Sequence, residues 1–433
     1  MTSRRDALLF GSCLVLQGCI FAGVALAARS SCAPSTIVAS LAACFLPYAG
    51  ALVFSRSVPR RRALDGLAIS AALVCGAALV FAPPVLSDDL YRYLWEGRLW
   101  LAGFNPYRIA PDDPTLAHLR DGLWTHINNR PLGSIYPPLS QLLFVVAQQL
   151  GGQVWTLKLI ALLVHVLCVA LLSRISSARN APLALALNPL LLGEAALNGH
   201  FDILCGLALF ISAWALARHR YLQAGVAAAA AVGLKVVGLI ALPLFARRPR
   251  ALLATGLAAA LMVLPLVWSR ALADPVSGPG QFATRWRGNE SVFALLDWLS
   301  RRFLDASSAA LVARPVVALV FLALCAVVVW RRVPPIPAIR WLLWALLLLS
   351  PQVHPWYLGW LIPIELAAGG SAGLVWSAAV LCAYIPLDRW VAEGVWDMPL
   401  WPQIFEYAIV AVALIIDPRR PSLGSHVQNP QIH

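Results

Sequence analysis

The sequence predicts an all-α polytopic membrane protein. Of its 433 residues, 60% are hydrophobic and only 12% are charged, which is far from the composition of soluble globular proteins. Apolar runs long enough to cross a bilayer recur from one end of the chain to the other. We therefore expect one integral-membrane domain over residues 1–433 and no sizeable soluble domain.

The positive charge is spread in a way that favours membrane topology over nucleic-acid binding. The formal net charge is +13, but the arginines form small clusters between apolar runs, as the positive-inside rule expects of cytoplasmic loops. These clusters are Arg4/Arg5, Arg56 with Arg60 to Arg62, Arg174/Arg179, Arg218/Arg220, Arg247/Arg248/Arg250, Arg331/Arg332/Arg340 and Arg419/Arg420. We therefore predict a lipid bilayer and no nucleic acid as a partner. Lysine occurs only at Lys158 and Lys235, so each needs its own explanation.

The nine cysteines lie in or beside apolar segments and form no C-x-x-C pair. This pattern favours small core residues over a disulfide framework or a zinc site. The first apolar segment, 7–28, is interpreted as an uncleaved signal anchor.

Three spans are expected before the first long polar loop, at about 7–28, 35–54 and 63–86. With Arg4 and Arg5 inside, the chain from Ser87 onward emerges on the outer face. The loop 87–135 is the longest polar stretch, and we expect it to be the catalytic one. Its aromatic residues suit helices that lie in the membrane interface. They are Trp95, Trp100, Tyr107 and Trp124.

Several later segments, within 136–433, are too short to span a bilayer. An outer half-helix at 138–150 keeps the following arginine clusters inside. The segment 221–245 fits a tight hairpin with Lys235 near its outer tip. About 11 to 13 helical elements are expected in all, some of them broken, which membrane proteins tolerate inside protein or beside a cavity.

The stretch from Ser87 to Arg98 concentrates charge at a predicted membrane boundary. Ser87 is the expected N-cap, with Asp88 and Asp89 in the first helical turn, where the helix dipole favours negative charge. Asp89, Arg92 and Glu96 then share one helical face. The alternative is an ordinary acidic helix start.

Polar residues converge on the outer end in this topology, whereas the inner end carries mainly arginines. Ionisable groups at membrane depth are costly and usually face a cavity or a partner, so one extracytoplasmic cavity is expected. The residues are Asp88, Asp89, Glu96, Tyr136, Glu194, Asn198, His200, Asp202, Lys235, Arg285, Arg287, His354 and Tyr357.

Each group also has a structural interpretation. Asn198, His200 and Asp202 could cap two helices, and His354 could be a buried core histidine. Trp341, Trp356 and Trp360 are expected to be interface anchors. His200 with Asp202 offers too few ligands for a metal site.

Four motifs, in order along most of the chain, resemble a known family. They are Asp89-Leu90-Tyr91-Arg92-Tyr93 with Gly103-Phe104-Asn105-Pro106-Tyr107, then Tyr136-Pro137-Pro138, then Asn188-Pro189 through Asn198-Gly199-His200-Phe201-Asp202, then Ser350-Pro351-Gln352-Val353-His354-Pro355-Trp356-Tyr357. The set is similar to the GT-C superfamily of integral-membrane glycosyltransferases. Bacterial polyprenyl-phosphomannose-dependent mannosyltransferases are the nearest in pattern.

The resemblance implies a GT-C-like helical bundle in a bacterial inner membrane, acting in the cell envelope. It implies a polyprenyl-phosphate-linked sugar donor, a glycan or glycolipid acceptor hydroxyl on the extracytoplasmic side, and inversion at the anomeric carbon. It also implies an Asp general base that maps onto Asp89, with Asp88 as the ambiguous neighbour, and no metal or other cofactor. Glu96 is a further candidate carboxylate.

Such chemistry also needs groups that hold the donor. Cations stabilise a departing lipid phosphate, and Lys235, Arg287 and His354 are the candidates. Lys158 is either an interfacial anchor or a second phosphate contact. The remaining expected donor contacts are His200, Asp202, Asn198, Tyr136 and Tyr357.

Two other classes of function compete. A transporter or flippase of a lipid-linked or small polar substrate would be expected to show repeated halves and midplane charges. The sequence shows no clear repeat, and its charges lie toward one face. A non-catalytic lipid-binding scaffold would not need Asp89, Glu96 and His200 together.

Overall fold

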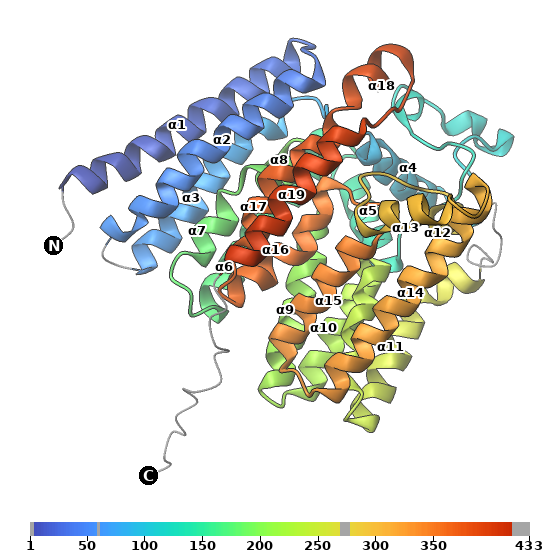
Figure 1. The fold of residues 1–433 in the computed structure, drawn as a ribbon. Helices are drawn as coiled ribbons and strands as arrows, with labels where there is room; N and C mark the ends of the chain where they lie inside the picture. Colours follow the sequence, from blue (N-terminus) through green and yellow to red (C-terminus); the bar gives the residue numbers. More distant parts are fainter. Residues whose placement is uncertain (1–3, 59–60, 269–277, 418–433) are drawn as a thin grey trace.

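The computed structural model of the protein describes residues 4–58, 61–268 and 278–417. Within these ranges the chain forms nineteen α-helices and six 3-10 helices, and its β pairing is limited to an isolated bridge between Gly288 and Gln352. Six helical segments are long and apolar enough to cross a membrane. The predicted all-α polytopic fold is confirmed (Figure 1).

The α-helices are more numerous than predicted, and several expected segments are broken. They are α1 (Arg4–Arg29), α2 (Pro34–Phe54), α3 (Arg61–Val80), α4 (Asp89–Leu101), α5 (Pro138–Gln149), α6 (Val154–Ile175), α7 (Ala181–Ala186), α8 (Pro189–Ala196), α9 (Asp202–Ala217), α10 (Tyr221–Leu234), α11 (Pro249–Trp268), α12 (Gly278–Thr284), α13 (Val292–Ser300), α14 (Ala306–Trp330), α15 (Pro335–Leu349), α16 (Leu358–Ala367), α17 (Ala372–Ala379), α18 (Leu387–Glu393) and α19 (Leu400–Ile416). The 3-10 helices are η1 (Ser55–Ser57), η2 (Pro114–Leu119), η3 (Trp124–His126), η4 (Val236–Phe245), η5 (Pro355–Tyr357) and η6 (Val380–Tyr384).

The third span ends earlier than its hydropathy predicts. α3 stops at Val80, because Pro83 and Pro84 follow and cannot continue the hydrogen-bond ladder of a helix. Lys158 is completely buried and donates hydrogen bonds to the carbonyl oxygens of Leu79 and Ala82. This lysine therefore satisfies the C-terminal end of α3 and is neither an interfacial anchor nor a phosphate contact.

Polar residues and prolines break the later segments. α5 has 12 residues, about 18 Å of helix, so it does not cross a bilayer of about 30 Å. The predicted segment 181–197 divides into α7 and α8 at Asn188 and Pro189, where the Asn188 side chain accepts a hydrogen bond from the Leu191 amide. Lys235 is extended between α10 and η4, which confirms the hairpin tip.

The arginine loops contact one another in two pairs. Arg61 donates to the carbonyl oxygens of Ser173 and Ser176, and Arg179 donates to that of Val58. Arg247 donates to the carbonyl of Val329. These contacts join loops that the positive-inside rule places on one side.

The first long loop, 87–135, and α12 lie at the other end of the bundle. A Cβ atom on Gly278, at the start of α12, would lie 2.2 Å from the carbonyl oxygen of Gly133. In Figure 1, α4 and the loop after it occupy the upper right, whereas the α9–α10 and α14–α15 turns lie at the bottom.

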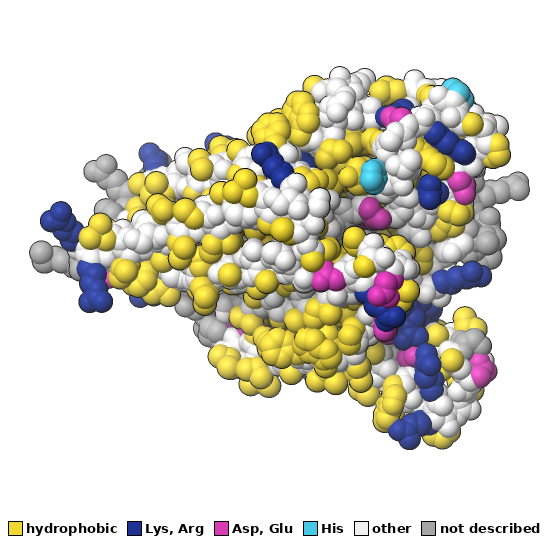
Figure 2. Space-filling view, turned by 90° about the horizontal axis from the view of Figure 1, so that it is seen from above, with side chains coloured by type: hydrophobic (Ala, Val, Ile, Leu, Met, Phe, Trp, Pro, Cys, Tyr) yellow, Lys and Arg dark blue, Asp and Glu magenta, His cyan; other side chains and the backbone are white. Residues whose placement is uncertain are grey.

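The surface between the two ends is apolar. Large side chains such as Leu46, Leu222, Leu319 and Ile415 are exposed along helices, as expected where lipid replaces water. In Figure 2, most acidic and histidine side chains lie toward the right of the view, whereas Lys and Arg side chains also appear on the left.

Candidate active site

The charged stretch starts α4 one residue later than predicted. The helix begins at Asp89, and Asp88 occupies the N-cap position without a side-chain capping bond. The Ser87 hydroxyl still accepts a hydrogen bond of 3.3 Å from the Asp89 amide. Ser87 is therefore not the N-cap, although it stabilises the same end of the helix.

Asn128 joins the two aspartates. Its side-chain amide nitrogen donates to Oδ1 of Asp88 at 2.6 Å and to Oδ1 of Asp89 at 2.8 Å. All three side chains are partly exposed. The second carboxylate oxygen of Asp89 faces the Tyr93 hydroxyl at 3.5 Å, so the two aspartates have different surroundings on their other sides.

Glu96 belongs to a buried clamp. Its Oε1 accepts a bond of 2.9 Å from Nε of Arg92, and its Oε2 accepts bonds of 2.6 Å from Ser134 and from Gln141. Arg92 in turn donates to main-chain carbonyls of Asn129 and of Leu132. Since both oxygens of Glu96 are occupied and it is 1% exposed, we infer that it fixes the Asn128 loop onto α4.

Aromatic residues connect α4 to the loop between α8 and α9. The Tyr93 hydroxyl lies 3.3 Å from Nδ1 of His200, and the Tyr93 ring packs edge-on against Tyr136 at 5.0 Å between centroids. On its far side, Nε2 of His200 lies 3.7 Å from Oε2 of Glu194. Glu194 also accepts a hydrogen bond from the Tyr384 hydroxyl.

The fourth motif meets this cluster through a stack of three rings. Trp356 lies between His200, at 4.1 Å between centroids and 11° between planes, and His354, at 4.3 Å and 7°. Tyr357 packs edge-on against His354 at 5.2 Å. The prediction that Trp356 anchors the interface is wrong, because it is buried within the site.

Lys235 reaches the same cluster from the hairpin tip. Its Nζ lies 3.4 Å from Oδ1 of Asp202 and 5.2 Å from the centre of the Tyr136 ring. Nε1 of Trp360 donates to the same Asp202 oxygen at 2.8 Å. Trp360 is 7% exposed, so it too is not an interface anchor.

Burial changes the ionisation of three side chains in the cluster, namely His200, His354 and Asp88. Burial lowers the pKa of His200 to about 3 and that of His354 to about 4, although the negative charge of Asp89 raises both. Both imidazoles are therefore neutral at neutral pH. Burial, together with the charge of Asp89, raises the pKa of Asp88 to about 6. The Lys235 side chain brings an amino group to the cluster.

Arg287 is engaged elsewhere. Its guanidinium donates to both oxygens of Glu290, at 2.5 and 2.7 Å, and to Asp297 at 3.0 Å, and these contacts raise its pKa. The Gly288–Gln352 bridge brings its main chain beside the fourth motif. The charge of its guanidinium is compensated by Glu290 and Asp297, which disfavours the predicted role as a donor-phosphate contact.

Asn198 is engaged by structural contacts, although its side chain caps neither α8 nor α9. It is completely buried, accepts from the Leu86 amide at 3.3 Å and donates to Glu194 at 3.3 Å. It therefore fixes the segment before α4 against α8, and any effect on a donor would be indirect.

The sequence interpretation missed several residues of the cluster. Tyr93 lies inside the first motif without a predicted role of its own, and Trp356 and Trp360 are predicted at the interface. Asn128 had no signal in the sequence, since a lone asparagine in a polar loop is unremarkable. In the described ranges, no group of three or more His, Cys, Asp or Glu side chains could hold a metal ion.

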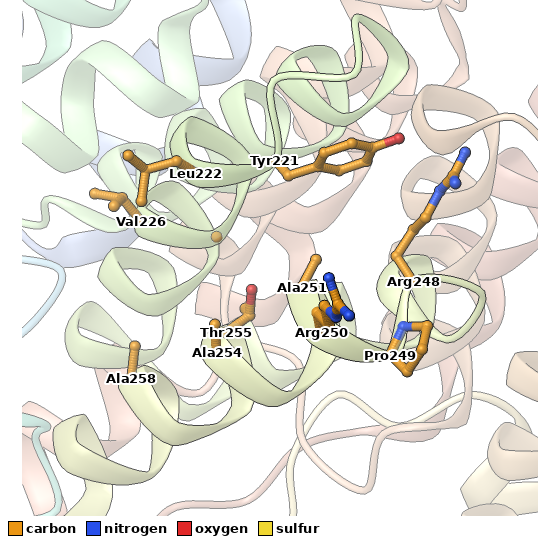
Figure 3. A pocket seen from close by; sticks show the side chains of 11 residues that line it. Tyr221, Leu222, Val226, Arg248, Pro249, Arg250, Ala251, Ala254, Thr255 and Ala258 are labelled. Atoms are coloured by element: carbon orange, nitrogen blue, oxygen red, sulfur yellow. The ribbon is translucent and has the colours of Figure 1, made fainter.

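A groove of about 560 Å³ lies away from this cluster, between α10 and α11. Figure 3 shows its lining, which includes Tyr221, Arg248 and Arg250. Since these residues lie at the arginine end of the bundle, this groove is not the predicted extracytoplasmic cavity.

Fold and cluster together define a polytopic membrane protein with a carboxylate, a lysine and neutral imidazoles gathered at one end. Residues 51–249 match the MptA_B family, whose description is alpha-(1->6)-mannopyranosyltransferase, N-terminal domain. The match covers a little under half of the chain, includes three of the four motifs and confirms the family resemblance over that part. Neither the curated proteins nor the solved structures gave a match. The family description supports the interpretation of this chain as a glycosyltransferase.

Proposed function

We propose that this protein is a membrane mannosyltransferase that uses a polyprenyl-phosphate-linked sugar donor. One observation carries the proposal. The partly exposed carboxylate of Asp89 and the ammonium of Lys235 flank the same pair of packed rings, Tyr93 and Tyr136. A base and a cation on two sides of one site match the needs of glycosyl transfer, and the family description names the sugar.

In the proposed reaction, the acceptor oxygen attacks the anomeric carbon from the face opposite the phosphate. Asp89 takes the hydroxyl proton as the new C–O bond forms, and the bond from the anomeric carbon to the phosphate oxygen breaks with its electron pair. Polyprenyl phosphate leaves, and the configuration inverts. Asp88 shares Asn128 with Asp89 but lies outside the helix, so we assign the base to Asp89.

Lys235 is the proposed contact to the departing phosphate. It is partly exposed, and its Nζ lies 3.4 Å from Oδ1 of Asp202, whereas His354 and His200 are neutral and can only donate or accept hydrogen bonds. Charge stabilisation at a developing oxyanion is usually a large term in catalysis. Three further side chains contact the donor in this proposal, namely Tyr136, Tyr357 and His354. Asp202 and His200 lie behind them and hold these donor-contacting side chains in position.

The proposed orientation places the cluster on the extracytoplasmic face of a bacterial inner membrane. It is supported by the joined arginine loops at the opposite end, since such loops are usually cytoplasmic. The acceptor is then a glycan or glycolipid hydroxyl outside the cytoplasm. We propose that no metal takes part.

The test is transfer of label from polyprenyl-phospho-[¹⁴C]mannose by the purified full-length protein in lipid vesicles. We expect labelled mannose on an added glycan acceptor, free polyprenyl phosphate in equal amount, and no loss of rate with EDTA. A flippase would instead move the intact labelled lipid between leaflets without cleaving it, and that result would replace the proposal.

A further inference from the structure

The groove between α10 and α11 has two different ends. Tyr221 and Arg248 lie at one end, and Leu222, Val226 and Ala258 lie at the other (Figure 3). The two helices approach closely between them, since a Cβ atom on Gly225 would lie 2.7 Å from the Thr255 hydroxyl. Small side chains on both helices therefore leave an apolar channel that ends in a basic mouth.

The arginines near the mouth differ in how they contact the rest of the protein. The neighbouring Arg247 donates to main-chain carbonyls of α14. In contrast, the Arg248 guanidinium lies over the Tyr221 ring at 5.4 Å, and no ion pair in the described part of the chain involves Arg248 or Arg250. Both side chains are exposed. The first turn of α11 also lacks an acidic residue, although a helix start favours a negative charge.

The groove is far from the candidate active site. Tyr221 begins α10 and Lys235 directly follows its last residue, so the 14 residues of this helix separate them by about 21 Å. That distance places the mouth in the opposite leaflet from Lys235. Leu222 is 82% exposed and Val226 62% exposed, so the apolar part of the groove opens toward lipid.

We propose that this groove binds one anionic membrane phospholipid. Its phosphate lies at Arg248 and Arg250, and an acyl chain follows the apolar channel past Val226 and Ala258. Charge complementarity selects this occupant, because basic groups at the membrane surface attract anionic headgroups. A zwitterionic headgroup carries an ammonium group of its own, which the two arginines repel. The apolar lining disfavours free phosphate.

The test is native mass spectrometry of the purified full chain in detergent with phosphatidylglycerol or phosphatidylcholine at equal concentrations. We expect one tightly bound phosphatidylglycerol, preferred by about 5- to 30-fold, since each arginine contributes roughly 1 kcal/mol. Arg248→Ala with Arg250→Ala should reduce the preference to near one. Ala254→Phe, at an exposed position in the groove, should remove the bound lipid of either kind.

Matched variants make the result specific. Arg331→Ala with Arg332→Ala removes two exposed arginines from the same end of the bundle but outside the groove, and should keep the preference. Equal binding of both lipids by the wild type would overturn the proposal, as would a preference that survives loss of Arg248 and Arg250. Tighter binding of polyprenyl phosphate than of phosphatidylglycerol at this groove would also overturn it. So would a dimer that Ala254→Phe abolishes, because a second copy of the chain would then occupy the groove. Unchanged melting temperatures show that each variant is folded.

Discussion

Nζ of Lys235 lies 3.4 Å from Oδ1 of Asp202. The contact joins the tip of the α10–η4 hairpin to the first residue of α9, and Asp202 is 2% exposed. A buried carboxylate needs a partner, so Lys235 has a structural role in addition to the proposed contact with the donor phosphate. Any experiment on Lys235 must separate these two roles.

Lys235→Ala should lower kcat/KM for the lipid-linked donor by about 10- to 100-fold, because a charge-assisted contact contributes about 1.5–3 kcal/mol. Lys235→Arg should rescue partly, since it keeps the charge but changes the geometry. The double variant Lys235→Ala with Asp202→Asn removes the unpaired carboxylate as well. If steady-state kinetics show that the double variant regains the wild-type kcat/KM, Lys235 has a purely structural role.

Asp89→Asn should reduce turnover by roughly two to four orders of magnitude, because the amide keeps the shape but cannot take the acceptor proton. Donor affinity should change little. Asp88→Asn is the matched control, since both side chains bond to Asn128, and it should remain active. If single-turnover measurements show the reverse order, the base is Asp88.

Asp88→Asn should also change stability in a pH-dependent way. The folded protein raises the pKa of Asp88 from 3.8 to about 6, so the folded state holds this proton more tightly than the unfolded state does. Ionised Asp88 therefore costs stability, with the cost growing between pH 3.8 and about 6 and complete above that. We expect Asp88→Asn to raise the melting temperature at pH 8 and to leave it unchanged below pH 3.8. An equal shift at both pH values would contradict this cause.

Glu96→Gln should lower stability and not the chemical step. The substitution leaves Arg92 with an uncompensated buried charge, a change that typically costs about 3–5 kcal/mol. The melting temperature should fall, while the single-turnover rate of the folded fraction should stay within a few-fold of wild type. A loss of rate as large as that expected for Asp89→Asn would instead assign Glu96 to the reaction.

Cysteine labelling tests the orientation. In a background without native cysteines, Asp112→Cys in the first loop should react with an impermeant maleimide in intact cells. Arg332→Cys, exposed at the arginine end, should react only after the membrane is opened. Reaction of Arg332→Cys alone in intact cells would invert the topology.

The sequence was sufficient to predict the all-α membrane fold, the hairpin at Lys235 and the half-helix at 138–150. These features follow from local properties, namely the length of apolar runs, the positions of proline and the clustering of arginine. It was also sufficient to place Asp88 and Asp89 at the start of α4 within one residue, since helix-start signals are short-range.

Only the tertiary structure decided which polar side chains are free to act. The sequence does not distinguish Asp89 and Lys235 from three other charged residues, namely Glu96, Arg287 and Lys158. In the structure, each of these three is hydrogen-bonded to residues from elsewhere in the chain. Trp356 likewise lies in the cluster and not at the interface, because its two histidine partners come from different motifs. A residue's type and spacing determine what it can do, but burial and pairing depend on long-range packing, which composition and periodicity do not encode.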